Sequence, residues 1–119
     1  MNRLKDKRRR RLRRKLHVRK RISGTASKPR MSIFKSNRHI YVQVIDDSEG
    51  TTLAAASNME KDLRDIKTNA KDAGRLGQAI GQRLKDKSIS QVVFDRNGYA
   101  YHGIIKAVAD GARKAGIQF

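Results

Sequence analysis

The sequence contains no cysteine and no tryptophan, a single proline, and few aromatic residues, which make up 5% of its 119 positions. Without cysteine, disulfide bonds, thiol catalysis and thiolate metal sites are excluded, and a reducing, cytoplasmic setting is expected. The longest apolar run covers only residues 53–56, far short of the roughly 20 residues that a membrane-spanning helix needs. Hydrophobic residues reach 37%, which predicts one small, aliphatic core.

Acidic residues are also scarce, because 11 Asp and Glu stand against 29 Lys and Arg, a net charge of +18. Residues 1–30 carry a net charge of +14, and the rest of the chain carries only +4. A secretory signal would need an apolar stretch after this basic start, and none follows. We therefore predict two parts, a basic N-terminal arm over residues 1–28 and a globular domain over residues 29–119.

The arm combines leucines at helical spacing with like charges four residues apart, such as Arg9 and Arg13, which disfavour a free helix. We expect it to be frayed alone and helical only against a polyanion. A solubility tail would be served equally by mixed charges, and a membrane-surface helix would carry Trp or Phe. Arginine prevails over lysine and suits phosphate oxygens, so the arm favours nucleic acid. Its candidate RNA-binding residues are Arg3, Lys7, Arg8, Arg9, Arg10, Arg11, Arg13, Arg14, Lys15, Arg19, Lys20 and Arg21.

From Met31 onward the hydrophobic pattern first has a period of two, which predicts a hairpin with one buried face, followed by a third strand over residues 51–57. Asn69 can cap a helix that runs to Leu84, with Asp72 as its return partner, and residues 91–94 form a short buried strand. A last helix over residues 104–115 ends at Gly116. These elements predict an α/β fold, a small two-layer α/β sandwich with one mixed sheet. Three glycines of the first helix suggest that it lies close to the sheet, namely Gly74, Gly77 and Gly81.

Two further patches favour nucleic acid. On the hairpin, aromatic, basic and amide side chains alternate with the core residues and would share one solvent face, unless helices cover that face as well. The second patch is the loop 95–103, which leads from a strand into a helix amino terminus, where an anion is favoured. The candidate RNA-binding residues of both patches are Arg30, Ser32, Phe34, Arg38, His39, Tyr41, Gln43, Arg96, Tyr99 and His102.

Catalysis is the main alternative, because aspartates near the strand ends could form the metal site of a small basic nuclease. These aspartates, Asp46, Asp47 and Asp95, are equally typical of turns, and no further carboxylate stands at strand spacing to complete a metal pair. The histidines lie far apart along the chain and form no zinc motif. We therefore predict no catalytic residue, no metal site and no cofactor.

The stretch SGTASKPRMSIFKSNRHIYVQVIDD, then TLAAAS, VVFDRNGYAYHG and the C-terminal KAVADGARKAGIQF closely resemble the bacterial large-subunit ribosomal protein eighteen family. The resemblance covers nearly the whole chain. It implies a non-catalytic protein of the cytoplasmic ribosome that binds 5S rRNA, helps attach it to 23S rRNA and lies beside other large-subunit proteins, with no membrane partner. After YHG the family usually has Arg, whereas Ile104 stands here, and Lys106 is a candidate substitute for that phosphate contact.

Overall fold

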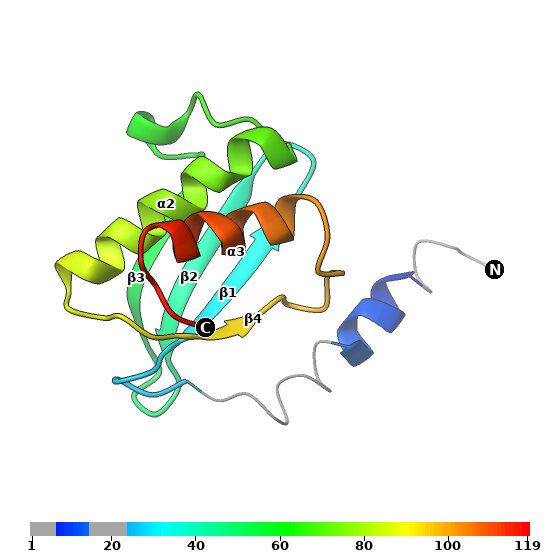
Figure 1. Ribbon diagram of the computed structural model, residues 1–119. Coiled ribbons are helices and arrows are strands. Elements are labelled where there is room, and N and C mark those ends of the chain that lie inside the picture. The colour runs from blue at the N-terminus through cyan, green and yellow to red at the C-terminus, as the bar shows by residue number, and fades with distance from the viewer. Residues whose placement is uncertain (1–6, 15–23) are drawn as a thin grey trace.

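A four-stranded mixed sheet forms one layer of the molecule. The computed structural model describes residues 7–14 and 24–119. The strands are β1 (Arg30–Lys35), β2 (Ile40–Asp46), β3 (Thr51–Ser57) and β4 (Val93–Asp95), in the spatial order β3-β2-β1-β4. β2 is antiparallel to β1 and to β3, whereas β4 is parallel to β1. The sequence is therefore correctly predicted to form a mixed sheet, and Figure 1 shows its strands side by side.

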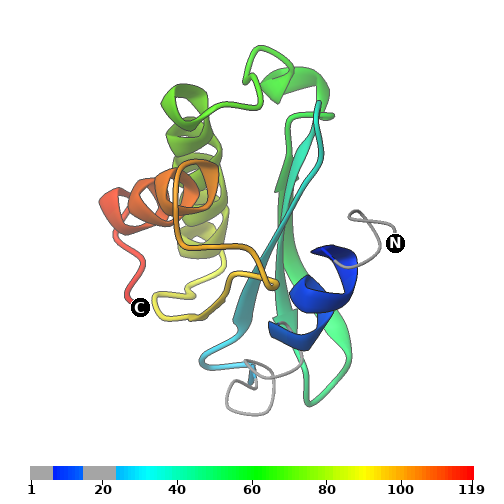
Figure 2. The ribbon, with the colours of Figure 1, turned by 90° about the vertical axis from the view of Figure 1, so that its right-hand side faces the viewer.

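The hairpin buries one face. Met31, Ile33, Val42 and Val44 have no exposed surface, whereas the residues between them are partly or largely exposed, as the period of two predicts. The buried side chains join those of α2 (Ala70–Asp86) and α3 (Ile104–Lys114) in one aliphatic core. Figure 2 shows both helices on the same side of the sheet. The predicted two-layer sandwich is thus confirmed.

The helical layer begins and ends as the sequence predicts, with one difference. The side chain of Asn69 accepts a hydrogen bond of 2.8 Å from the backbone N–H of Asp72 and so caps α2. The Asp72 carboxylate accepts from the backbone N–H of Lys67 rather than from Asn69. Gly116 follows α3 with a φ of +103°, a conformation that favours glycine and ends the helix.

The glycines of α2 serve a different contact from the predicted one, because they face α3 rather than the sheet. A Cβ on Gly77 would collide with the backbone of Val108, and one on Gly111 would collide with the backbone of Gly74. The two helix backbones therefore approach more closely than side chains would allow. This contact fixes the position of α3 and of the loop that precedes it.

The predicted last strand is shorter than expected. It covers only Val93–Asp95, because the backbone N–H of Val92 bonds to the carbonyl of Gln118 at the C-terminus. A three-residue 3-10 helix, η1 (Lys61–Leu63), lies in the connection between β3 and α2. None of the helices in the described residues is both long and apolar enough to cross a bilayer.

Candidate nucleic-acid interface

The sheet face opposite α2 and α3 carries the polar and aromatic residues predicted for the hairpin. The β1–β2 register pairs Ser32 with Gln43 and Phe34 with Tyr41. Phe34 is 49% exposed, and the other three side chains are partly exposed. α2 and α3 pack on the other face (Figure 2), so these two helices do not cover the polar and aromatic side chains of the hairpin. We call this surface the open face.

Residues 7–14 of the arm form a helix beside the β1 and β4 edge (Figure 1), on the side of the sheet away from α2 and α3 (Figure 2). Arg11 donates to the Tyr99 hydroxyl at 3.1 Å, and its guanidinium lies 4.9 Å from the centre of the Tyr99 ring. Arg14 donates to the Gly98 carbonyl at 3.1 Å. The expectation of a helix only against a polyanion is therefore not met, because the loop supplies both contacts instead.

The other predicted residues of the arm divide into two sets. Five of them lie outside the described residues, namely Arg3, Lys15, Arg19, Lys20 and Arg21. The remaining ones are exposed on the described helix: Lys7, Arg8, Arg9, Arg10 and Arg13.

Tyr99 joins three segments rather than standing free in solvent. Its hydroxyl accepts from Arg11 and donates to the backbone carbonyl of Lys35 at 3.1 Å, and its ring packs against the core. The Lys35 ammonium lies 5.7 Å from the ring centre. Tyr99 also lines a groove of about 460 Å³ between arm and globule, and none of the described residues that line this groove carries a carboxylate. The cations lining this arm groove are Lys7, Arg8, Arg11, Arg14 and Lys35.

The other side chains of the loop 95–103 differ in exposure and in hydrogen bonding. His102 is exposed, and Arg96 is partly exposed. Tyr101 accepts a hydrogen bond from Arg113 at 2.9 Å and packs edge-on against Phe94. Ile104, at the position where the resemblance predicts arginine, is partly buried against the core, whereas Lys106 is exposed.

Arg30 lies inside the fold, although the alternation placed it among the candidate RNA contacts. Its side chain is 9% exposed. Nε and Nη2 donate to Asp47 at 3.0 and 3.1 Å, and Nη1 donates to Asp95 at 2.7 Å. The hydrogen bond to Asp47 raises the pKa of Arg30 above its ordinary value, against the opposing effect of burial. The guanidinium is thus held by two carboxylates of its own chain.

The same cluster fixes the root of the arm. Asp47 accepts from the backbone N–H of Gly24 at 2.8 Å, and its own N–H donates to the Gly24 carbonyl at 3.0 Å. A Cβ on Gly24 would collide with Arg30 and with the carbonyl of Ile45, so the chain passes closely here. Asp95 accepts from the backbone N–H of Asn97 at the start of the loop. Arg30 therefore ties the arm root to the loop that holds the arm helix.

This geometry removes the aspartates from a catalytic role. Asp46 is buried and accepts from the backbone and hydroxyl of Ser48, as a turn residue does. Asp47 and Asp95 surround a guanidinium. Among the described residues, no group of three His, Asp or Glu could hold a metal ion.

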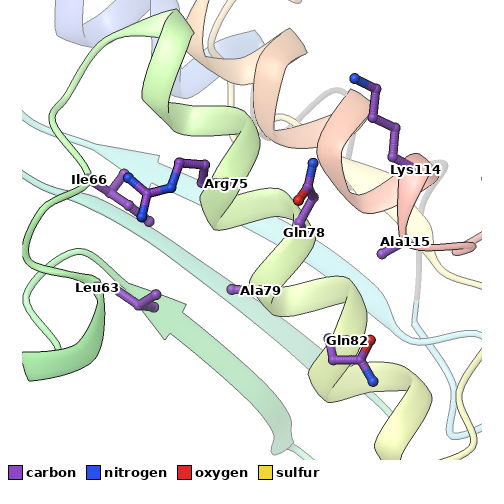
Figure 3. A pocket seen from close by; sticks show the side chains of 8 residues that line it. All are labelled: Leu63, Ile66, Arg75, Gln78, Ala79, Gln82, Lys114 and Ala115. Carbon is purple, nitrogen blue, oxygen red and sulfur yellow. The ribbon is translucent and has the colours of Figure 1, made fainter.

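A further groove on the helical layer has a different character (Figure 3). It lies along α2 and the end of α3, and glutamines and small apolar residues form much of its lining. Its Arg75 is paired with Asp65 at 2.6 Å. The surface suited to a polyanion is therefore the arm groove together with the open face. Sequence reasoning missed Lys35 in this surface, because nothing in the pattern shows that the end of β1 meets the arm.

Fold and surface together define a small basic α/β protein with a groove lined by five cations between arm and globule, and an exposed aromatic residue on the sheet face opposite its helical layer. The model of a family described as ribosomal L18 of archaea, bacteria, mitochondria and chloroplast matches residues 5–119. The chain belongs to this family of ribosomal proteins, which are structural proteins and not enzymes. The membership confirms the predicted resemblance and the predicted location in the large ribosomal subunit.

Individual relatives agree over the same length. The large ribosomal subunit protein uL18 of Treponema denticola is 61% identical over 114 residues, which cover 96% of this chain and 95% of the relative. The uL18 proteins of Treponema pallidum and Staphylococcus aureus are 55% and 47% identical, again over 96% of this chain and over 95% and 96% of the relatives. Each is named as a large-subunit protein.

Proposed function

We propose that the chain binds 5S rRNA and helps attach it to 23S rRNA within the large subunit, as the family resemblance implies. The observation that carries this proposal is the arm groove, which five cations line together with Tyr99 and to which no described residue contributes a carboxylate. Cations gathered in this way suit the phosphates of a nucleic acid. Other large-subunit proteins remain proposed neighbours of the globule.

The two parts of the surface would make different kinds of contact. The arm supplies charge along the sugar-phosphate backbone, which gives affinity with little sequence information. The open face offers Phe34, Tyr41 and Gln43, which can stack on unpaired bases and hydrogen-bond to their edges. His102 and Arg96 extend this surface at the loop. The arm over residues 1–28 would thus supply affinity, and the domain over residues 29–119 would supply selectivity.

The test is a titration of labelled 5S rRNA with the full-length protein, with transfer RNA as competitor and a hydroxyl-radical footprint of the complex. We expect a footprint confined to one region of 5S rRNA and binding that survives excess transfer RNA. Equal competition by transfer RNA and no footprint would contradict the proposal. The RNA should also remain intact when Mg²⁺ is added, because the described residues contain no group of three His, Asp or Glu that could hold a metal ion.

A further inference from the structure

A second basic groove lies at the end of the sheet where β1 turns into β2. It has a volume of about 640 Å³ and is lined by the turn and by the connection between β3 and α2, which Figure 1 shows at the same end of the molecule. None of the described residues that line it carries a carboxylate. Its basic side chains come from both walls: Arg38 and His39 from the turn, Arg64 and Lys67 from the connection. We call it the turn groove.

The two walls are fixed to each other by one buried side chain. Asn58 is 7% exposed, and its carbonyl oxygen accepts from the backbone N–H of Ile40 at 3.1 Å. Its amide nitrogen donates to the carbonyls of Arg38 at 3.2 Å and of Ile66 at 3.0 Å. The turn groove is therefore a formed feature of the fold, and its cations are carried on a backbone that is already ordered.

In the connection between β3 and α2, acidic and basic side chains lie on different sides. Over residues 58–68 it has as many acidic as basic residues, but helix α2 binds two of the carboxylates. Glu60 pairs with Arg83 at 2.9 Å, and Asp65 pairs with Arg75 at 2.6 Å. The arginine hydrogen bonds hold the pKa of both carboxyl groups below their ordinary values, so both stay ionised and bound to α2.

The cations on the other side keep no such partner. Among the described residues, neither a hydrogen bond nor an ion pair engages the side chain of Arg38, Arg64 or Lys67. Asn37 lines both the turn groove and the arm groove, so the two basic surfaces meet at this residue. A ligand of the same chemistry can therefore extend from one groove into the other.

We propose that the turn groove binds a sugar-phosphate backbone of RNA, an inference that rests on the proposed function and adds Arg64 and Lys67 to the interface. Continuity with the arm groove favours RNA over an acidic peptide, as does the presence of guanidinium groups, which fit phosphate oxygens with two hydrogen bonds. The RNA is either a continuation of the 5S rRNA on the arm or a segment of 23S rRNA.

The test compares the double variant Arg64→Ala, Lys67→Ala with a matched double variant, Lys85→Ala, Lys114→Ala, which removes the same charge from the helical layer. One measurement is binding of full-length protein to 5S rRNA over a range of salt concentrations. The other is capture of labelled 23S rRNA by a preformed complex of protein and immobilised 5S rRNA. Thermal melts of the free proteins should be unchanged, because among the described residues the side chains of Arg64 and Lys67 take part in no hydrogen bond or ion pair.

Two results would support the proposal and identify the RNA. If the groove holds 5S rRNA, the slope of log affinity against log salt becomes shallower by about one to two units, since each phosphate contact contributes roughly 0.7 to 0.9. If it holds 23S rRNA, 5S binding is unchanged and capture of 23S rRNA falls several-fold relative to the matched variant. Equal behaviour of both double variants in both measurements would overturn the proposal. This is also the result expected if the true ligand of the turn groove is an acidic peptide. Failure of the unmodified protein to bind 5S rRNA would instead contradict the proposed function.

Discussion

Arg30 connects segments that lie 17 and 65 residues away along the chain, through Asp47 and Asp95. Strand alternation places it correctly on the face opposite the helices, but alternation cannot show that two carboxylates converge there. The physical reason is that ion pairs between distant segments depend on the closed fold and not on local periodicity. Sequence reasoning therefore assigned to RNA a cation that the fold already binds.

Replacing Arg30 by Met should lower the free energy of unfolding by about 3 to 5 kcal/mol, because the fully buried Asp95 and the partly buried Asp47 would both lose this cation. Urea denaturation of the free protein measures this loss. The matched control is Arg75→Met, which breaks the exposed pair with Asp65 and should cost less than about 1 kcal/mol. Equal losses in the two variants would show that the Arg30 cluster does not hold the fold together.

His102 differs from Tyr99, although both were predicted for the loop on the same grounds. His102 is exposed, and only its backbone is hydrogen-bonded, to the Ala100 carbonyl. His102→Ala should therefore weaken 5S rRNA binding by about 1 to 3 kcal/mol, the range for loss of one stacked base, without changing the melting temperature or the salt slope. Tyr99→Ala should lower the melting temperature as well, since Tyr99 joins loop, arm and β1. Normal affinity of the His102 variant would remove that residue from the interface.

At the scale of elements, the sequence predicts the sheet and both helices of the layer well, because each has a strong hydrophobic period. The short β4 is predicted less accurately. The pairing of Val92 with Gln118 depends on where the C-terminus lies, and no local pattern encodes that position. The α2 glycines were correctly linked to a close approach, but periodicity gives the face of a helix and not the identity of its neighbour.

The close contact between α2 and α3 can be tested with two glycine substitutions in α2. Gly77→Ala would place a methyl group against the backbone of Val108, force the helices apart and lower the free energy of unfolding by about 1 to 3 kcal/mol. Gly74→Ala is the matched control, because its methyl group would lie 3.7 Å from the Ala107 carbonyl, an ordinary contact. That variant should be neutral or gain up to about 1 kcal/mol from helix propensity. Equal destabilisation by both substitutions would contradict a glycine contact centred on Gly77.

Across the described parts of the molecule, the two basic grooves and the helical layer differ in the carboxylates that lie beside their arginines. Arginines of the helical layer pair with carboxylates, as in Arg83 with Glu60 and Arg113 with Asp110. Among the described residues, those that line the arm groove and the turn groove include no carboxylate. The basic arm can be predicted from composition alone. The absence of carboxylates beside the turn groove cannot, because it depends on the fold: Glu60 and Asp65 are close to this groove in sequence but pair with arginines of α2.

If the protein binds 5S rRNA as proposed, the basic arm should carry most of the electrostatic affinity. The salt dependence of 5S rRNA binding can be compared for the full-length protein and for a variant that lacks residues 1–21. We expect the slope of log affinity against log salt to become shallower by several units, because each phosphate that the arm neutralises contributes roughly 0.7 to 0.9. The melting temperature of the globule should change little, since the arm root at Gly24 is retained. An unchanged slope with the same folded globule would show that the arm does not contact phosphate.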